Sequence, residues 1–251
     1  ALARLAALQA PPPPLPEGLR AQLRDYQVEG YQWLAQRAEA GVGACLADDM
    51  GLGKTLQVIA LLAQRSSRGA ALVVCPTSVV DNWREQIERF APHLTMVLCG
   101  PRQKLLPEGI HICSYRRLLS DRKALSEHGW DCVILDEAQA IKNSHSQTAR
   151  AAYQVSASAL CRVATTGTPI ENRLLELWSL FRFLNPALLG PLAAFRQRYE
   201  KPAGHALSAG QLKVKARLRP FLLRRLKSQV LQQLPPRTEI VVRVELSESE
   251  R

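Results

Sequence analysis

The chain has 251 residues, of which 47% are hydrophobic and 22% charged, as in ordinary folded globular proteins and unlike disordered ones. The 33 Lys and Arg residues outnumber the 22 Asp and Glu residues, for a net charge of +11, which favours a polyanionic partner. These values exclude a disulfide-stapled miniprotein, a collagen and a coiled coil. The length fits one large domain or two small ones.

The N-terminal segment, residues 1–18, contains four consecutive prolines and is predicted to be a Pro-rich linker or tail. No apolar run approaches the roughly 18 residues that a membrane span needs, so we expect no membrane partner. No two of the six cysteines are closer than 14 residues. This spacing offers no C-x-x-C pair for zinc or redox chemistry and indicates reduced thiols.

Helical and extended patterns alternate along the chain. A helix is predicted at 24–40, and an amphipathic one at 172–184 precedes a loop-rich stretch at 186–211. The predicted strands are 44–47, 71–75, 95–99, 110–113, 131–135 and 160–165, and helices are predicted near 54–65, 78–90, 115–126 and 146–155. Continuous apolar strands are covered on both faces, which indicates an α/β fold with a mainly parallel β-sheet flanked by helices. Ligands of such folds bind at the carboxyl ends of the strands.

A glycine-rich loop follows the first predicted strand and leads into a helix. Its sequence is Asp48-Asp49-Met50-Gly51-Leu52-Gly53-Lys54-Thr55. The glycines allow backbone N–H groups to surround phosphate oxygens. Lys54 would then reach the outer phosphates, and the Thr55 hydroxyl would bind magnesium. The usual pattern has Gly where this chain has Asp48, and the alternative is a glycine turn with an exposed lysine.

A second candidate group stands at the end of the apolar strand 131–135. Asp136 would hold the magnesium ion, and Glu137 would orient and deprotonate the attacking water. The alternative is a pair of surface carboxylates at a helix N-terminus, where negative charge is favourable. Together the two groups predict an ATPase that uses ATP and Mg²⁺, with Lys54, Asp136 and Glu137 as catalytic residues.

Several segments resemble the Swi/Snf-type ATPases, the helicase-like DNA translocases of superfamily two. They are DDMGLGKTLQ at 48–57, DEAQ at 136–139 with IKN at 141–143, TGTPIEN at 166–172, and PFLLRRLK at 220–227. The resemblance covers about residues 19–246, and its DEAQ and IEN segments are more similar to bacterial members. It implies a RecA-like ATP-binding P-loop lobe at 19–188 and a family-specific helical insertion at 189–236, which forms a basic C-terminal extension. Residues 237–251 would begin the connection to a second RecA-like lobe that the sequence lacks.

The resemblance also implies roles for individual residues. Gln27 is the candidate reader of adenine, with a helix-surface amide as the alternative, and Asp49, Met50, Gly51, Leu52, Gly53, Lys54 and Thr55 would bind ATP. The residues implied in coupling the nucleotide site to DNA movement are Gln139, Thr166, Gly167 and Thr168. The small hydroxyls of this last segment would bond Asp136 or Glu137, and Thr165 stands where many relatives have Leu.

The implied partner is double-stranded DNA. Its candidate contacts are Pro76, Thr77, Ser78, Lys213, Lys215 and Arg217, whereas Trp83 is expected to pack in the core. Residues 211–227 contain seven positive and no negative residues. The patterns leave open whether this segment binds phosphates directly or couples the two lobes.

The resemblance therefore implies the N-terminal ATPase lobe of an ATP-dependent double-stranded DNA translocase or remodeller. Such a lobe binds Mg-ATP and DNA and needs its second lobe for efficient hydrolysis. The alternatives are a strand-separating RNA or DNA helicase of superfamily two, or, in isolation, a nucleotide- and DNA-binding module with little turnover. The expected location is cytoplasmic and nucleoid-associated in a bacterium, or nuclear in a eukaryote.

Overall fold

The computed structural model describes residues 8, 10–100, 103–167, 174–199 and 209–230. Their core is a seven-stranded sheet with the strand order β3-β4-β2-β5-β6-β1-β7, and all its pairings are parallel. The strands are β1 (Ala44–Leu46), β2 (Ala71–Cys75), β3 (Met96–Leu98), β4 (Ile110–Ser114), β5 (Cys132–Leu135), β6 (Cys161–Thr165) and β7 (Leu222–Leu223). The structure confirms the predicted parallel α/β fold and the six predicted strands, with ends shifted by a residue or so, and adds β7.

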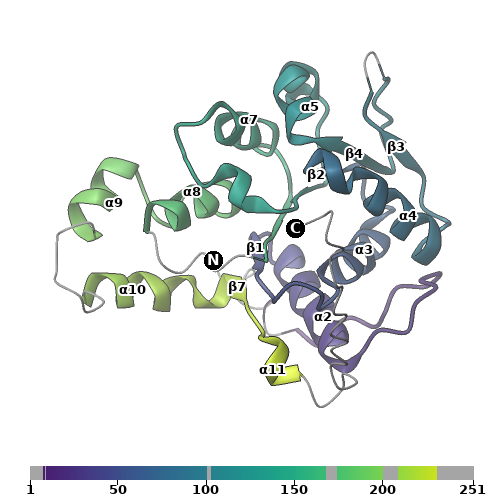
Figure 1. The fold of residues 1–251 in the computed structure, drawn as a ribbon, viewed down its shortest axis with the longest axis horizontal. Helices are drawn as coiled ribbons and strands as arrows, with labels where there is room; N and C mark the ends of the chain where they lie inside the picture. The colour runs from purple at the N-terminus through teal and green to yellow at the C-terminus, as the bar shows by residue number, and fades with distance from the viewer. Residues whose placement is uncertain (1–7, 9, 101–102, 168–173, 200–208, 231–251) are drawn as a thin grey trace, which may run out of the picture.

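Helices cover both faces of this sheet (Figure 1). On one face lie α2 (Asp25–Glu39), α3 (Lys54–Arg65) and α4 (Val80–Phe90), the last preceded by the short 3-10 helix η1 (Thr77–Val79). On the other face lie α5 (Tyr115–Ser120), α6 (Arg122–Glu127), α7 (Gln147–Val155) and α8 (Leu174–Leu184). The remaining helical elements are η2 (Ala138–Ile141), α9 (Leu192–Tyr199), α10 (Ala209–Leu218), η4 (Arg219–Phe221) and α11 (Lys227–Val230).

Alternate strand residues supply two separate apolar cores. Val73 and Ile134 pack with the side of α2, α3 and α4, whereas Leu72 and Leu135 pack with the side of α5 to α8. Both faces of the strands are therefore buried, which is why the strands have continuous apolar sequences.

Two predicted segments differ from the structure. The predicted helix at 115–126 is divided at Asp121 into α5 and α6. The predicted loop-rich stretch at 186–211 contains α9 and the start of α10, because Gly190 and Pro191 precede a helix there and do not interrupt it. Phe195 of α9 is fully buried against the core.

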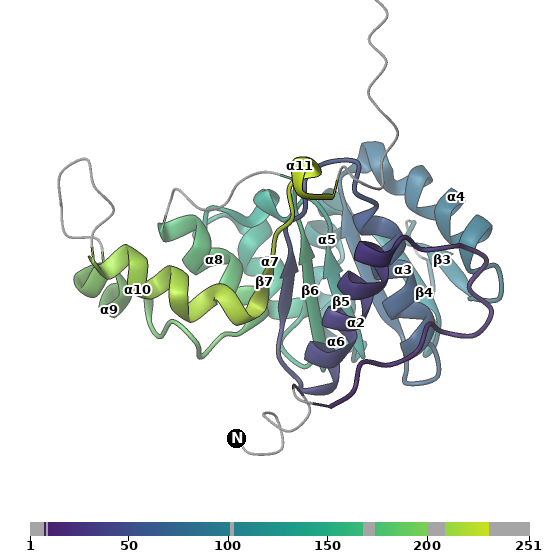
Figure 2. The same cartoon turned by 90° about the horizontal axis from the view of Figure 1, so that it is seen from below.

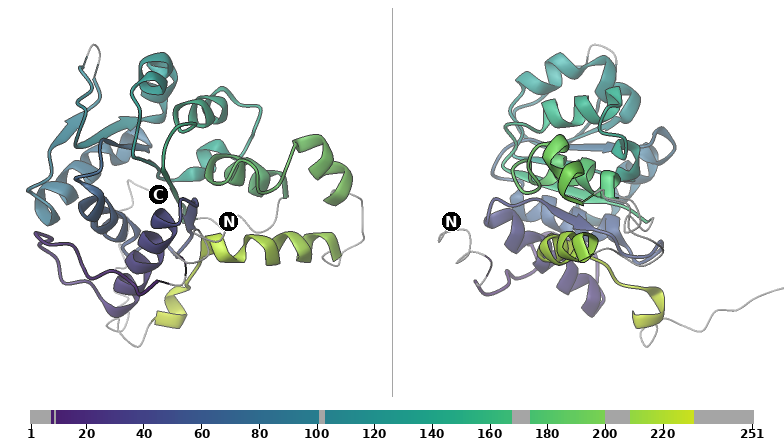
Figure 3. Two further views of the ribbon diagram at one scale, coloured as in Figure 1. Left: turned by 180° about the vertical axis from the view of Figure 1, so that it is seen from behind. Right: turned by 90° about the vertical axis from the view of Figure 1, so that its left-hand side faces the viewer.

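The terminal segments of the described region contact different parts of the fold. Part of the predicted Pro-rich linker runs along α2, where the Tyr31 hydroxyl donates to the carbonyl of Pro14 over 2.8 Å. At the other end, β7 pairs with β1, while α9 and α10 project sideways from that edge (Figures 2 and 3). None of the helices in the described ranges has the length and hydrophobicity of a membrane span.

Candidate functional site

The loop between β1 and α3 has a backbone that only glycine adopts without strain at two positions. Gly51 and Gly53 have φ angles of +84° and +72°, in the left-handed region. A Cβ atom on Gly53 would lie 2.3 Å from Nε2 of Gln27. The chain enters α3 at Lys54, so the loop leads directly from the carboxyl end of β1 into a helix N-terminus, an arrangement that suits anion binding.

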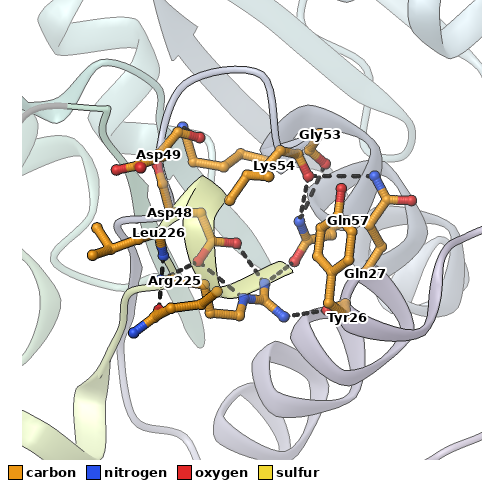
Figure 4. Close-up of polar contacts among 11 residues, drawn as sticks. Tyr26, Gln27, Asp48, Asp49, Gly53, Lys54, Gln57, Arg225 and Leu226 are labelled. Atoms are coloured by element: carbon orange, nitrogen blue, oxygen red, sulfur yellow. Dashed lines mark hydrogen bonds and ion pairs between the residues drawn. The ribbon is translucent and has the colours of Figure 1, made fainter. Parts of the chain in front are cut away.

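Lys54 lies between this loop and the end of β5. Its Nζ donates to the backbone carbonyls of Asp48 over 2.7 Å and Asp49 over 3.2 Å (Figure 4). Burial lowers the pKa of Lys54, and the negative charges of Asp48, Glu137 and Asp136 act in the opposite direction. The structure thus brings together the predicted catalytic lysine and both predicted carboxylates, and Thr55, half-buried, follows Lys54 in the first turn of α3.

Three donors hold the carboxylate of Asp136. Nε1 of Trp83 donates to Oδ2 over 2.8 Å. Oγ1 of Thr165 and the backbone N–H of Glu137 donate to Oδ1 over 2.5 and 3.0 Å. A carboxylate offers about four lone-pair sites, so these three bonds leave about one unused. The carboxylate is therefore fixed in direction and still able to accept one further contact.

Glu137 has a strained backbone and an oriented side chain. Its φ of +48° is the one positive value at a non-glycine residue in the described part of the chain, at a typical cost of about 1–3 kcal/mol. Nε2 of Gln139 donates to Oε2 of Glu137 over 2.7 Å, and Oγ1 of Thr166 donates to Oε1 of Gln139 over 3.1 Å. Two side chains predicted to take part in coupling therefore form a chain of hydrogen bonds that ends on the predicted water-activating carboxylate.

The hydroxyl on Asp136 comes from a residue that the sequence did not single out for it. The hydroxyls of the TGTP segment are predicted to bond Asp136 or Glu137; Thr166 reaches Glu137 through Gln139, and the hydroxyl on Asp136 comes from Thr165. Thr165 is the last residue of β6, beside β5, and is fully buried. Gly167 also lies close to the phosphate loop, since a Cβ there would be 2.6 Å from Cγ of Met50. Thr168 lies outside the described residues.

Trp83 has the core position predicted for it, with a further contact. It is fully buried in α4, so the expectation of core packing is confirmed. The bond from its indole to Asp136 was not anticipated. The available signal was a Trp beside the polar Asp81 and Asn82 in the first turn of a helix, because a buried indole N–H needs an acceptor.

Gln27 is a buried amide, so the alternative of a helix-surface amide is wrong: only 8% of the residue is exposed. Oε1 accepts from the backbone N–H of Arg24 over 3.0 Å, and Nε2 donates to the carbonyl of Leu52 over 3.3 Å. An amide has two donors and two lone pairs, and these two bonds use one of each.

The candidate DNA contacts lie in two separate places. Thr77 and Ser78 are exposed in η1, directly after β2. Lys213, Lys215 and Arg217 lie on α10, beyond the β7 edge of the sheet, where Lys215 is half-buried and the other two are exposed. Figures 1 and 3 show α4 and α10 at opposite ends of the molecule. The structure therefore does not bring these two sets together.

A phosphate-type loop with its lysine, facing a strand that ends in two held carboxylates, defines the class of P-loop ATPases with a RecA-like fold. The match to known proteins is more specific. The model of the SNF2-related domain matches residues 26–251. The chain belongs to the SNF2-related family, which confirms the resemblance to helicase-like Swi/Snf ATPases.

Relatives come from bacteria, archaea and eukaryotes. The Bacillus subtilis protein YwqA is 39% identical over 93% of this chain and 27% of its own length. The ISWI chromatin-remodeling complex ATPase CHR11 of Arabidopsis thaliana is 37% identical over 94% of this chain and 24% of its own. The chain thus spans about a quarter of the length of these two relatives.

The solved structure of a Sulfolobus solfataricus SWI2/SNF2 ATPase core in complex with dsDNA superposes with a TM-score of 0.82 and 38% identity. The match covers 88% of this chain and 48% of that one. The fold is therefore that of part of a SWI2/SNF2 ATPase core.

Proposed function

We propose that the chain is the first ATPase lobe of a Swi/Snf-type translocase that hydrolyses Mg-ATP as it moves on double-stranded DNA. The observation that carries this proposal is the meeting of Lys54, Asp136 and Glu137 at one edge of the sheet, where each carboxylate is held by other side chains. Family membership supports the reaction class.

The phosphate loop and its neighbours would bind the nucleotide. The loop N–H groups, the α3 N-terminus and Lys54 would hold the phosphates, and the side-chain amide of Gln27 would read the adenine edge. Thr55 and Asp136 would hold Mg²⁺, because hydroxyl, carboxylate and phosphate oxygens suit this ion. The bound ion would supply neutralisation of charge on the phosphates.

Glu137 would orient and deprotonate the water that attacks the γ-phosphate. Gln139 keeps one of its carboxylate oxygens in place, and Thr166 fixes Gln139 from the end of β6. A movement of the strand end at Thr166 would therefore change the position of the base. This chain of bonds is our candidate for coupling hydrolysis to movement on DNA, with Gly167 and Thr168 in the same segment.

Duplex DNA is the proposed partner because a solved relative of this fold is in complex with dsDNA. Thr77 and Ser78, with Pro76 before them, present exposed hydroxyls at a helix start, which suits phosphate oxygens. Lys213, Lys215 and Arg217 add positive charge at a second place. A second RecA-like lobe would supply arginines that neutralise the transition state, an effect of roughly 10³–10⁵ in rate in comparable enzymes. The location follows the organism, nucleoid-associated or nuclear.

ATP hydrolysis by the full-length protein, measured with and without nucleic acid, tests this function. We expect stimulation by duplex DNA above that by single strands or duplex RNA, and loss of hydrolysis in Lys54→Ala and Glu137→Gln. Lys123→Ala, an exposed lysine on α6, is the matched control and should be unaffected. Equal hydrolysis with and without nucleic acid would contradict the proposal, and strand separation of a labelled duplex would favour a helicase.

Salt and truncation give two further readouts. Each phosphate contact on a duplex contributes about −0.9 to the slope of log affinity against log salt concentration. Lys213→Ala should therefore make this slope less negative by about 0.9. The isolated residues 1–251 should bind nucleotide and DNA with little turnover. Brisk hydrolysis by this segment alone would show that no second lobe is needed.

A further inference from the structure

The segment that follows β7 runs alongside the phosphate loop. β7 pairs with β1 through Cys45–Leu222 and Leu46–Leu223. The pairing continues beyond both strands, because the N–H of Asp49 donates to the carbonyl of Arg225 over 3.0 Å. The N–H of Lys227 then donates to Oδ2 of Asp49 over 3.0 Å.

Arg225 sits at the centre of this contact (Figure 4). Its guanidinium forms a fork on Asp48, with Nη2 to Oδ2 at 2.5 Å and Nε to Oδ1 at 3.1 Å, and its backbone N–H donates to the same Oδ1 over 2.9 Å. Nη2 also donates to Oε1 of Gln57 over 2.9 Å, and Nη1 donates to the carbonyl of Tyr26. One side chain from the C-terminal segment thus contacts the loop, α3 and α2.

Gln57 connects Arg225 to the backbone of the phosphate loop. Its Nε2 donates to the carbonyls of Leu52 and Gly53, both over 3.3 Å, and Leu52 also accepts from Gln27. Space for the arrangement comes from Gly30, since a Cβ there would be 1.8 Å from Oε1 of Gln57. The bonds therefore run without interruption from Arg225 to the candidate adenine reader.

Burial makes Asp48 dependent on Arg225. The Asp48 side chain is fully buried and that of Arg225 is 13% exposed. A buried carboxylate deprived of its partner is strongly destabilising, because the lost water contacts are then not replaced. Asp48 occupies the loop position where the general phosphate-loop pattern has Gly, so this pair explains the departure from that pattern.

We propose that Arg225 is a positioning residue of the nucleotide site: docking of the C-terminal segment through Arg225 and Asp48 sets the phosphate loop and Gln27 for ATP binding. Arg225 is thus committed to the loop and does not belong to the DNA-facing charges of residues 211–227. Because coupling free energies are reciprocal, ATP binding must also stabilise the docked segment. This inference rests on the proposed function of the loop as an ATP site.

A substitution that keeps the charge and removes the fork tests the proposal. In the full-length protein we would compare Arg225→Lys with the matched control Arg219→Lys, an exposed arginine of the same segment. Affinity is measured with Mg²⁺ and a fluorescent ATP analogue without DNA, alongside the melting temperature. We expect Arg225→Lys to weaken nucleotide binding at least tenfold and Arg219→Lys to leave it unchanged. If Arg225→Lys lowers the melting temperature but leaves nucleotide affinity unchanged, Arg225 serves only as a structural ion pair, and the proposal is overturned.

Hydrogen exchange of the wild-type protein tests the same point without any variant. Saturating nucleotide should slow exchange of the amides of Asp49, Arg225 and Lys227 at least tenfold, since these N–H groups form the contact between loop and segment. Unchanged exchange at Arg225 and Lys227 in nucleotide-saturated protein would overturn the proposal. Failure of the wild type to bind the analogue would instead refute the proposed function itself, so the two failures are distinguishable.

Discussion

The indole of Trp83 donates a hydrogen bond of 2.8 Å to the carboxylate of Asp136 and so joins helix α4 to the end of strand β5. Trp83 lies in the first turn of α4, the helix that directly follows η1 with its exposed Thr77 and Ser78. One fully buried side chain therefore connects the proposed DNA-contacting segment with the proposed magnesium ligand. If DNA binding shifted η1, the shift would change the position of the Asp136 carboxylate through this hydrogen bond.

Replacing Trp83 with Phe should uncouple the η1 segment from Asp136. The ring would still fill the core, but a buried acceptor would lose its donor, which typically costs about 1–3 kcal/mol. We expect a higher Mg²⁺ concentration for half-maximal hydrolysis and a smaller stimulation by duplex DNA, both measured by ATPase titration of the full-length protein. Trp33→Phe, at a half-buried tryptophan that stacks with Arg37 on α2, is the control. If the Mg²⁺ requirement and the DNA stimulation change equally in both variants, the indole N–H of Trp83 has no specific role.

Thr165 offers an independent test of how Asp136 is held. Thr165→Val removes only the hydroxyl that donates to Oδ1, so we expect a loss of about 1–3 kcal/mol of stability in urea unfolding and a reduced kcat. Thr165→Ser restores the hydroxyl and should recover most of the activity. If Thr165→Val and Thr165→Ser have the same stability and the same kcat, packing and not the hydrogen bond accounts for the effect.

Gly53→Ala should abolish nucleotide binding. Left-handed backbone costs a non-glycine residue roughly 1–2 kcal/mol, and the added Cβ would also approach within 2.3 Å of Nε2 of Gln27. Gly41 has a similar φ of +63° with open space around it, so Gly41→Ala carries the backbone cost alone. Titration with a fluorescent ATP analogue should therefore show loss only for Gly53→Ala, although both proteins carry the backbone cost and are destabilised.

His111 should make the fold sensitive to mild acid. Burial and the neighbouring His128 lower its pKa below 6.5, and its Nε2 must stay unprotonated to accept the N–H of Leu106 over 2.9 Å. Below about pH 6.5 the unfolded chain binds more protons than the folded one. The stability contribution is therefore complete above that pH and is lost as the pH falls towards the folded pKa.

Urea midpoints at pH 7.5 and 5.5 measure this effect. The midpoint of the wild type should fall more than that of His111→Gln, which keeps an acceptor but does not titrate. The exposed His145 gives the control His145→Gln, which should retain the wild-type fall. An equal fall in all three proteins would assign the acid sensitivity to other groups.

The strands and the phosphate loop could be predicted because each has a local pattern. Residues 71–75 form an unbroken apolar run, and β2 has the same bounds. The two residues of β7 are too short for any periodicity, and their place depends on pairing with β1. The contacts that hold the site join residues far apart in sequence, such as Trp83 with Asp136 and Arg225 with Asp48. No spacing rule reports such pairs, so the sequence predicted Gln139 and Thr166 near the carboxylates but not the bonds from Trp83 and Arg225.

In the described part of the chain β7 is the edge strand beside β1, so the sheet includes residues far along the chain from residue 188, the predicted end of the RecA-like lobe. A fragment ending at residue 188 would expose the open side of β1, a short apolar strand with unpaired backbone groups. Such edges recruit other strands and cause aggregation. Fragments for solution work should therefore extend through Val230, the end of α11.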